Sequence, residues 1–120
     1  MKKLLIVDDA AFMRLSIRNM LMKYDLEIVG EAANGAIGVD MYKELRPDVV
    51  TMDITMPTMS GLEALKAIKA FDPRAKVIMV SAMGQEEMVK ESIMSGAKTF
   101  IVKPFKEEVL YQTICKVLGI

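Results

Sequence analysis

Four short apolar runs in this chain each end in polar side chains that could do chemistry. In chain order these are Asp8 and Asp9 after the first run, Asp53 after the second, Ser81 after the third and Lys103 after the fourth. Each run is too short for the core of a helix and is typical of a buried strand. In open parallel sheets, ligands bind beyond the carboxyl ends of the strands, near the point where the strand order reverses. The pattern predicts one pocket that could hold a divalent cation and a phosphoryl group.

The carboxylates of Asp8, Asp9 and Asp53 would need a counter-charge. Two like charges about 4 Å apart repel each other by about 4 kcal/mol at an effective dielectric constant of about 20. Either one acid is protonated or a cation is bound, and Mg²⁺ suits carboxylate and carbonyl ligands that share it with phosphate oxygens. One carboxylate could then attack phosphorus and form an aspartyl phosphate. We predict Asp53 as this nucleophile, because it stands alone whereas Asp8 and Asp9 form a pair better suited to metal binding.

Lys103 and Ser81 match the remaining needs of phosphoryl transfer. The transferring group spreads negative charge over its oxygens and requires a cation and a hydrogen-bond donor. Lys103 would supply the cation and Ser81 the donor. Each polar residue alone has an ordinary explanation as a helix cap, a turn acid or a surface lysine. Their shared position at the ends of separate strands favours a common site.

The elements that would position these residues alternate between strand and helix. Apolar runs predict strands at 4–7, 27–31, 49–52, 76–80 and 99–102, and apolar spacing predicts helices at 11–24, 36–45, 61–71, 85–95 and 106–118. Successive βα units predict an α/β fold with a doubly wound, flavodoxin-like, five-stranded parallel sheet in the order 2-1-3-4-5. In that order the second strand lies at an edge, which explains why it contributes nothing to the site.

Composition predicts a single soluble domain over residues 1–120. No apolar stretch approaches the roughly 18 residues needed to span a bilayer, and the apolar run after Lys2 and Lys3 is too short for a signal peptide. A cytoplasmic location is therefore expected. Sixteen basic residues balance sixteen acidic ones, so no basic field would attract nucleic acid. We expect a monomer without a nucleic-acid or membrane partner.

The chain has no histidine and a single cysteine. The absence of histidine excludes a Ser-His-Asp triad, a histidine-ligated metal and a phosphohistidine within this chain. A phosphoryl group that arrives from a histidine must therefore come from a partner. Cys115 cannot form an internal disulfide and is interpreted as a small core residue of the last helix.

Several short segments resemble the receiver domain of bacterial two-component response regulators. In order along the chain they are Ile6-Val7-Asp8-Asp9, Met52-Asp53-Ile54-Thr55-Met56-Pro57, Ser60-Gly61, Val80-Ser81-Ala82 and Val102-Lys103-Pro104-Phe105. The segments 10–14 and 81–85, and the lack of an output domain after Ile120, are most similar to stand-alone chemotaxis regulators. The resemblance implies phosphoryl transfer to Asp53 from a histidine kinase of the CheA type. It also implies a flagellar motor switch protein as output partner and a phosphatase as a further partner.

The resemblance further assigns roles around the metal. It implies Asp9 and Asp53 as Mg²⁺ ligands, Asp8 as the residue that holds the waters of the metal, and the backbone carbonyl of Thr55 as another ligand. The bond between Lys103 and the following proline would be cis, which proline tolerates. The chain would be a phosphoacceptor signalling protein that assists its own phosphorylation and dephosphorylation, rather than an enzyme.

The resemblance also implies a switch. The hydroxyl of Ser81 would move toward the phosphoryl oxygen, and the aromatic ring of Phe100 would swing inward to fill the vacated space. Phe100 as an ordinary core residue is the alternative. The residues at 55 and 83 would tune hydrolysis of the aspartyl phosphate, but Thr55 and Met83 offer neither a carboxylate nor an amide to orient water.

Two methionines of the fourth predicted helix indicate a surface that could bind a partner. Met88 and Met94 favour a docking surface on the face of the fourth helix, fifth strand and fifth helix, with irregular core packing as the alternative.

Other functions remain as alternatives. A phosphorelay shuttle and a receiver fragment of a transcriptional regulator would share the same phosphoryl chemistry. A phosphatase with an aspartate nucleophile would have a second acid where Thr55 stands. A flavin-binding flavodoxin-like protein would have hydroxyl- and glycine-rich loops in place of Asp8 and Asp9.

Overall fold

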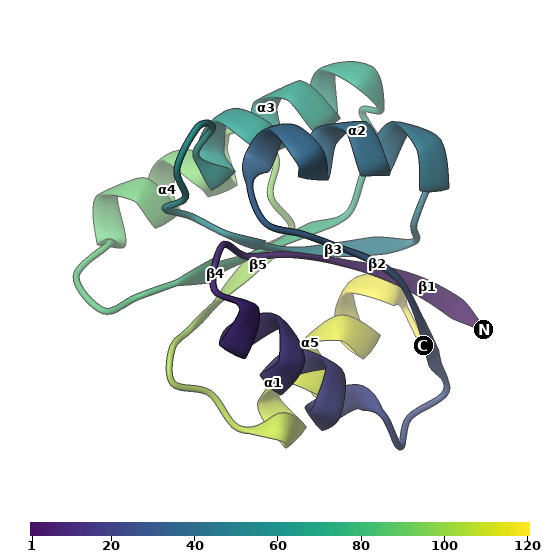
Figure 1. Cartoon of the computed structure of the whole chain (residues 1–120). Helices are drawn as coiled ribbons and strands as arrows, with labels where there is room; N and C mark the ends of the chain where they lie inside the picture. Colours follow the sequence, from purple (N-terminus) through teal and green to yellow (C-terminus); the bar gives the residue numbers. More distant parts are fainter.

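The computed structural model describes residues 1–120, and its helices cover both faces of one parallel sheet (Figure 1). The strands are β1 (Lys2–Val7), β2 (Leu26–Ala32), β3 (Val49–Asp53), β4 (Val77–Ser81) and β5 (Thr99–Val102). The helices are α1 (Ala11–Leu21), α2 (Gly35–Leu45), α3 (Gly61–Phe71), α4 (Glu86–Met94) and α5 (Glu107–Leu118). The strand order is β2-β1-β3-β4-β5, which confirms the predicted topology.

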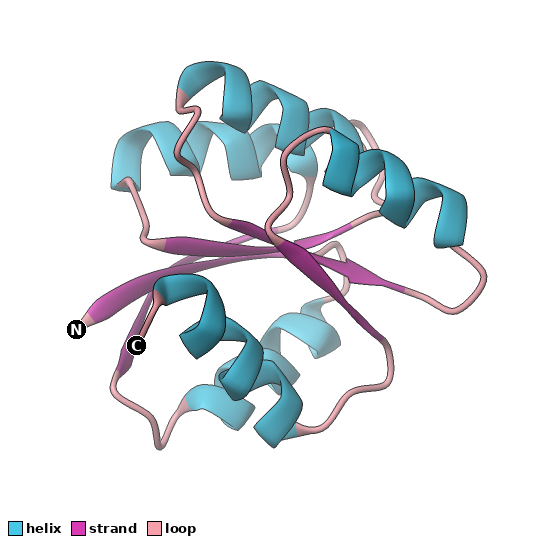
Figure 2. Ribbon diagram, turned by 180° about the vertical axis from the view of Figure 1, so that it is seen from behind, coloured by secondary structure: helices cyan, strands magenta, loops and turns pink.

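The sheet lies between two helical layers. The helices α2, α3 and α4 cover one face, and α1 and α5 cover the other (Figures 1 and 2). Along β1, Leu5 and Val7 join the core under α2 and α3, whereas Leu4 and Ile6 join the core under α1 and α5. Burial on both faces explains why the strands are continuous apolar runs and not alternating patterns.

Local capping defines several helix ends. Ser60 and Glu63 form a capping box at the start of α3, in which each side chain accepts from the other residue's backbone N–H. The side chain of Asn34 accepts from the N–H of Ile37 at the start of α2. That helix ends at Leu45, and the residue that follows it, Arg46, has a φ of 49° immediately before a proline.

Two expectations for the α1 and α5 layer are wrong in detail. Helix α1 ends at Leu21 and not at residue 24, because the chain turns there to enter β2 at Leu26. Tyr24 nevertheless continues the apolar face from this turn, since its ring stacks on Tyr111 with centroids 3.7 Å apart. Cys115 is only half-buried and is not a core residue. None of the helices has the combination of length and apolar character that crossing a lipid bilayer requires.

Candidate functional site

Three carboxylates meet at the carboxyl ends of β1 and β3. Asp8 and Asp9 directly follow β1, and Asp53 is the last residue of β3. One oxygen from each carboxylate lies within 4.8 Å of the others, with Asp8 and Asp53 buried and Asp9 exposed. Because β2 lies on the other side of β1, this is the point where the strand order reverses. The structure therefore brings the predicted acids together at the predicted edge of the sheet.

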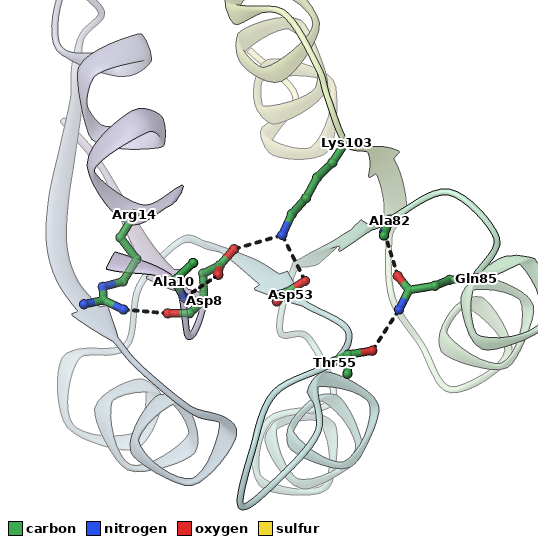
Figure 3. Close-up of polar contacts among 8 residues, drawn as sticks. All are labelled: Asp8, Ala10, Arg14, Asp53, Thr55, Ala82, Gln85 and Lys103. Carbon is green, nitrogen blue, oxygen red and sulfur yellow. Dashed lines mark hydrogen bonds and ion pairs between the residues drawn. The ribbon is translucent and has the colours of Figure 1, made fainter. Parts of the chain in front are cut away.

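Lys103 reaches this cluster from the segment that follows β5. Its Nζ lies 3.3 Å from Oδ2 of Asp8 and 3.3 Å from Oδ1 of Asp53. Figure 3 shows the ammonium group pointing between the two carboxylates. The peptide bond that joins Lys103 to Pro104 is cis, as expected.

The electrostatics of the cluster reflect three acids around one lysine. Burial, together with the negative charge of Asp8, raises the pKa of Asp53 to about 6, although Lys103 acts in the opposite direction. Partial burial would lower the pKa of Lys103, but the nearby carboxylates of Asp53 and Asp8 hold it above its ordinary value. Lys103 is therefore protonated at neutral pH, and a single ammonium does not fully compensate the carboxylates.

Asp8 is held by the start of α1. Its Oδ1 accepts from the N–H of Ala10 at 2.9 Å, and its backbone carbonyl accepts from Nη1 of Arg14 at 2.7 Å. The Nε of Arg14 also donates to Glu31 at 3.2 Å, which ties the site to the end of β2. The sequence alone indicated no role for Arg14. Its place one turn into a helix that follows the acids was the available signal, because helical side chains lean toward the N-terminus.

Glycine at position 61 lets α3 start against the backbone of the site. The N–H of Gly61 donates to the carbonyl of Ile54 at 2.6 Å. A Cβ at this position would lie 1.9 Å from the carbonyl oxygen of Asp53. Only glycine permits so close an approach, so the contact fixes the end of β3 and with it the Asp53 carboxylate.

Ser81 ends β4 next to Asp53, and Phe100 lies on the following strand β5, where it pairs with Met79. Val80 pairs with Asp53 across the sheet, and Ser81 is the next residue, buried at the end of β4. The side chain of Phe100 is 42% exposed and is therefore not an ordinary core residue. Both Ser81 and Phe100 line a cavity of about 550 Å³ between α4, β5 and the loop before α4.

The methionines of α4 divide between core and surface. Met94 is exposed and lines the cavity beside Phe100. Met88 packs instead against the core under α2 and α3. Met94 is therefore the more accessible of the two, and Met88 is half-buried.

The loops after β3 and β4 meet through a glutamine, Gln85, for which the sequence alone indicated no role. The hydroxyl of Thr55 accepts from Nε2 of Gln85 at 2.8 Å, and Oε1 of Gln85 accepts from the N–H of Ala82 at 2.6 Å. Met83 of the same loop is 80% exposed and lines the cavity beside α4. The available signal was a glutamine just before the acidic first turn of α4, where Ser, Thr, Asp or Asn is usual.

Comparisons with known proteins agree with this geometry. The family model of the response regulator receiver domain matches residues 4–115. The chain is 54% identical over 116 residues to the chemotaxis protein CheY of Thermotoga maritima, covering 97% of each protein. It is 56% identical over 117 residues to CheY of Bacillus subtilis, covering 98% of each. The solved CheX-CheY-BeF3-Mg²⁺ complex from Borrelia burgdorferi contains a similar chain, with a TM-score of 0.92, 41% identity and coverage of 97% of this chain and 88% of that one. This chain belongs to the response regulator receiver domain family.

Proposed function

We propose that this protein accepts a phosphoryl group on Asp53 from the phosphohistidine of a histidine kinase and thereby changes its affinity for an output partner. One observation carries the proposal: Lys103 lies 3.3 Å from both Asp8 and Asp53 inside a cluster of three carboxylates. The cluster supplies a nucleophile, and Lys103 supplies the positive charge that a transferring phosphoryl group requires.

The donor set fits Mg²⁺. Asp8, Asp9 and Asp53 offer hard carboxylate oxygens within 4.8 Å of one another, and Lys103 alone leaves them under-compensated. These residues, with the backbone carbonyl of Thr55, would hold the ion. When bound, Mg²⁺ neutralises the carboxylates and withdraws charge from the phosphoryl oxygens.

Asp53 performs the transfer as a nucleophile. A carboxylate oxygen of Asp53 forms a bond to phosphorus while the bond from phosphorus to the imidazole nitrogen of the donor breaks. The imidazole leaves with the electron pair and is protonated from solvent. Lys103 and the hydroxyl of Ser81 stabilise the negative charge on the phosphoryl oxygens. Hydrolysis reverses the modification when a water oxygen bonds to phosphorus, the bond to Asp53 breaks, and phosphate leaves.

Partners follow from the chemistry and the relatives. The chain contains no histidine, so the donor belongs to another protein, proposed as a kinase of the CheA type. The similarity to CheY proteins supports the flagellar motor switch as the output partner. The cavity beside Met94 and Phe100 is its proposed docking surface. A phosphatase is a further proposed partner, and the CheX-CheY complex gives a precedent for a relative that binds an additional protein.

Labelling with acetyl phosphate in the presence of Mg²⁺ tests the acceptor. The intact mass of the wild type should increase by one phosphoryl group, and that of Asp53→Asn should not, because the amide is not a nucleophile of comparable strength. Asp40→Asn, an exposed aspartate of α2, serves as the control and should label like the wild type. Undiminished labelling of a folded Asp53→Asn protein would place the acceptor elsewhere and overturn the proposal.

A further inference from the structure

One glutamine side chain joins the two loops beside the acidic cluster. Its carboxamide donates to the hydroxyl of Thr55 at 2.8 Å and accepts from the N–H of Ala82 at 2.6 Å. In Figure 3 the Gln85 side chain reaches back from the start of α4 to a place between Ala82 and Thr55, on the side of the site away from Arg14. Thr55 follows two positions after Asp53. Gln85 therefore connects the loop that follows the proposed acceptor to the loop that follows β4.

Gln85 is not used to cap its own helix. It precedes the first residue of α4, and its side chain makes no hydrogen bond to the free N–H groups of that helix. Glu86 and Glu87 occupy the first turn and complement the positive end of the helix dipole. The carboxamide of Gln85 is thus committed to the two loops and not to the start of α4.

The N–H of Ala82 is a main-chain donor that a phosphoryl group on Asp53 could use. Val80 pairs with Asp53 on the neighbouring strand, so Ser81 and Ala82 continue beyond the acceptor at a strand spacing of about 4.8 Å. A phosphoryl group carries negative charge on several oxygens and favours any donor within reach. In the unmodified protein this donor is already bound to Gln85.

We propose that Gln85 is a positioning residue that holds the two loops in the unphosphorylated arrangement and must release the Ala82 N–H before a phosphoryl oxygen can accept it. The proposal rests on Asp53 as the acceptor and adds a residue that sets the phosphorylation equilibrium without contacting that carboxylate.

Beryllofluoride, a mimic of the phosphoryl group, measures the equilibrium in the presence of Mg²⁺. Gln85→Ala should bind it about two- to tenfold more tightly than the wild type, the range expected when one neutral hydrogen bond no longer has to be broken. Gln85→Ala should also be labelled by acetyl phosphate faster than the wild type. Gln85→Glu keeps an oxygen for the Ala82 N–H and should show no gain. Glu87→Ala, an exposed change in the same turn, should match the wild type.

A second measurement examines the bridge in the metal-free protein. Amide hydrogen exchange at Ala82 should be faster in Gln85→Ala than in the wild type, because the acceptor of this N–H has been removed. Thr55→Val removes the hydroxyl that anchors Gln85, so it should also tighten beryllofluoride binding. In the Gln85→Ala background the same Thr55 change should have no further effect, since its partner is absent.

The outcomes separate this inference from the proposed function. A wild type that labels on Asp53, together with a Gln85→Ala variant of unchanged or weaker beryllofluoride affinity, would overturn the role of Gln85 alone. If the effects of Thr55→Val and Gln85→Ala on beryllofluoride affinity were additive, the hydrogen bond between the two side chains would not be the cause of the tighter binding. A wild type that neither labels nor binds beryllofluoride would overturn the acceptor site and this inference together.

Discussion

The ammonium group of Lys103 lies 3.3 Å from a carboxylate oxygen of Asp53, although 50 positions separate the two residues in the sequence. The contact joins the ends of β3 and β5, which have β4 between them. It is the main charge compensation that the chain itself provides for the buried carboxylate of Asp53.

Lys103→Met should lower the free energy of unfolding of the metal-free protein by on the order of 1 to 3 kcal/mol, because two buried carboxylates lose their counter-charge while the side-chain volume is kept. Urea unfolding in EDTA measures this loss. Mg²⁺ should reduce the difference, and labelling by acetyl phosphate should remain slow. Wild-type labelling rates in this variant would remove Lys103 from the transfer step.

Mg²⁺ should raise the melting temperature of the wild type, because an ion that binds only the folded state stabilises it by mass action, by about 1.4 kcal/mol at ten times its Kd. Asp9→Ala should weaken this stabilisation more than Ser81→Ala, since the exposed carboxylate of Asp9 is a proposed ligand and the Ser81 hydroxyl is not. Differential scanning fluorimetry over a Mg²⁺ titration gives both affinities. Equal losses would contradict this division of roles.

Phe100→Ala should leave labelling of Asp53 intact and reduce the conformational response to it. Phosphorylation adds roughly 1.5 to 2 negative charges near Ser81, and the shared cavity allows the ring of Phe100 to follow a movement of that hydroxyl. Phosphorylation and partner binding are typically coupled by about 1 to 3 kcal/mol in allosteric proteins. We expect Phe100→Ala to lose this gain in partner affinity.

Methyl NMR reads this response without a partner, because Met94 lines the same cavity as Phe100. Beryllofluoride and Mg²⁺ should shift the Met94 methyl signal in the wild type and shift it less in Phe100→Ala. Phe12→Ala, which removes an exposed ring from α1, should behave like the wild type. An equal shift in Phe100→Ala would disprove the relay.

Tyr42→Phe should destabilise the protein in a pH-dependent manner. The Tyr42 hydroxyl donates to Asp72 at 2.7 Å, and this bond holds the pKa of Asp72 below its ordinary value. Because the pKa of Asp72 is lower in the folded than in the unfolded protein, its charge stabilises the folded state at pH values above the unfolded pKa of about 4. This stabilisation is lost as the pH falls through the pKa of Asp72 in the folded protein. We expect a difference of about 1 kcal/mol at pH 7, modest because Asp72 is solvated.

Urea unfolding of the wild type and Tyr42→Phe between about pH 2 and 7 measures the effect, since the range spans the ordinary pKa of aspartate. The difference between the two proteins should shrink in acid. When both proteins also carry Asp72→Asn, the difference in their free energies of unfolding should no longer change near pH 4, the ordinary pKa of aspartate. A constant difference at all pH values in the original background would mean that the bond does not act through the charge of Asp72.

Gly61→Ala should lower both stability and labelling. The new Cβ would lie 1.9 Å from the carbonyl oxygen of Asp53, a backbone atom that cannot rotate away, so α3 or the end of β3 must shift. Overpacking of this kind costs about 1 to 3 kcal/mol. Gly30→Ala is the matched control because its nearest neighbours, from 3.1 Å, are flexible side-chain atoms. Similar losses in both variants would show that Gly61 has no special relation to the site.

The sequence alone determined the order of elements and the location of the site. Buried strands are short apolar runs, and the carboxyl ends of parallel strands share one edge of the sheet. The residues after those runs therefore had to gather there, as Asp8, Asp53 and Lys103 do. Boundaries were less well determined, because the apolar spacing that includes Tyr24 continues through the turn after α1.

Only the tertiary structure decided which side chains meet around that edge. The bridge from Gln85 to Thr55 spans 30 positions, and the bond from Arg14 to the carbonyl of Asp8 joins a helix to a loop. Phe100 is exposed although it lies in a strand, because it lines the cavity beside α4. Periodicity predicts the face on which a residue of a helix or strand lies, but loop side chains have no period. Their directions follow from local backbone torsion angles and from neighbouring segments that arrive from distant parts of the chain.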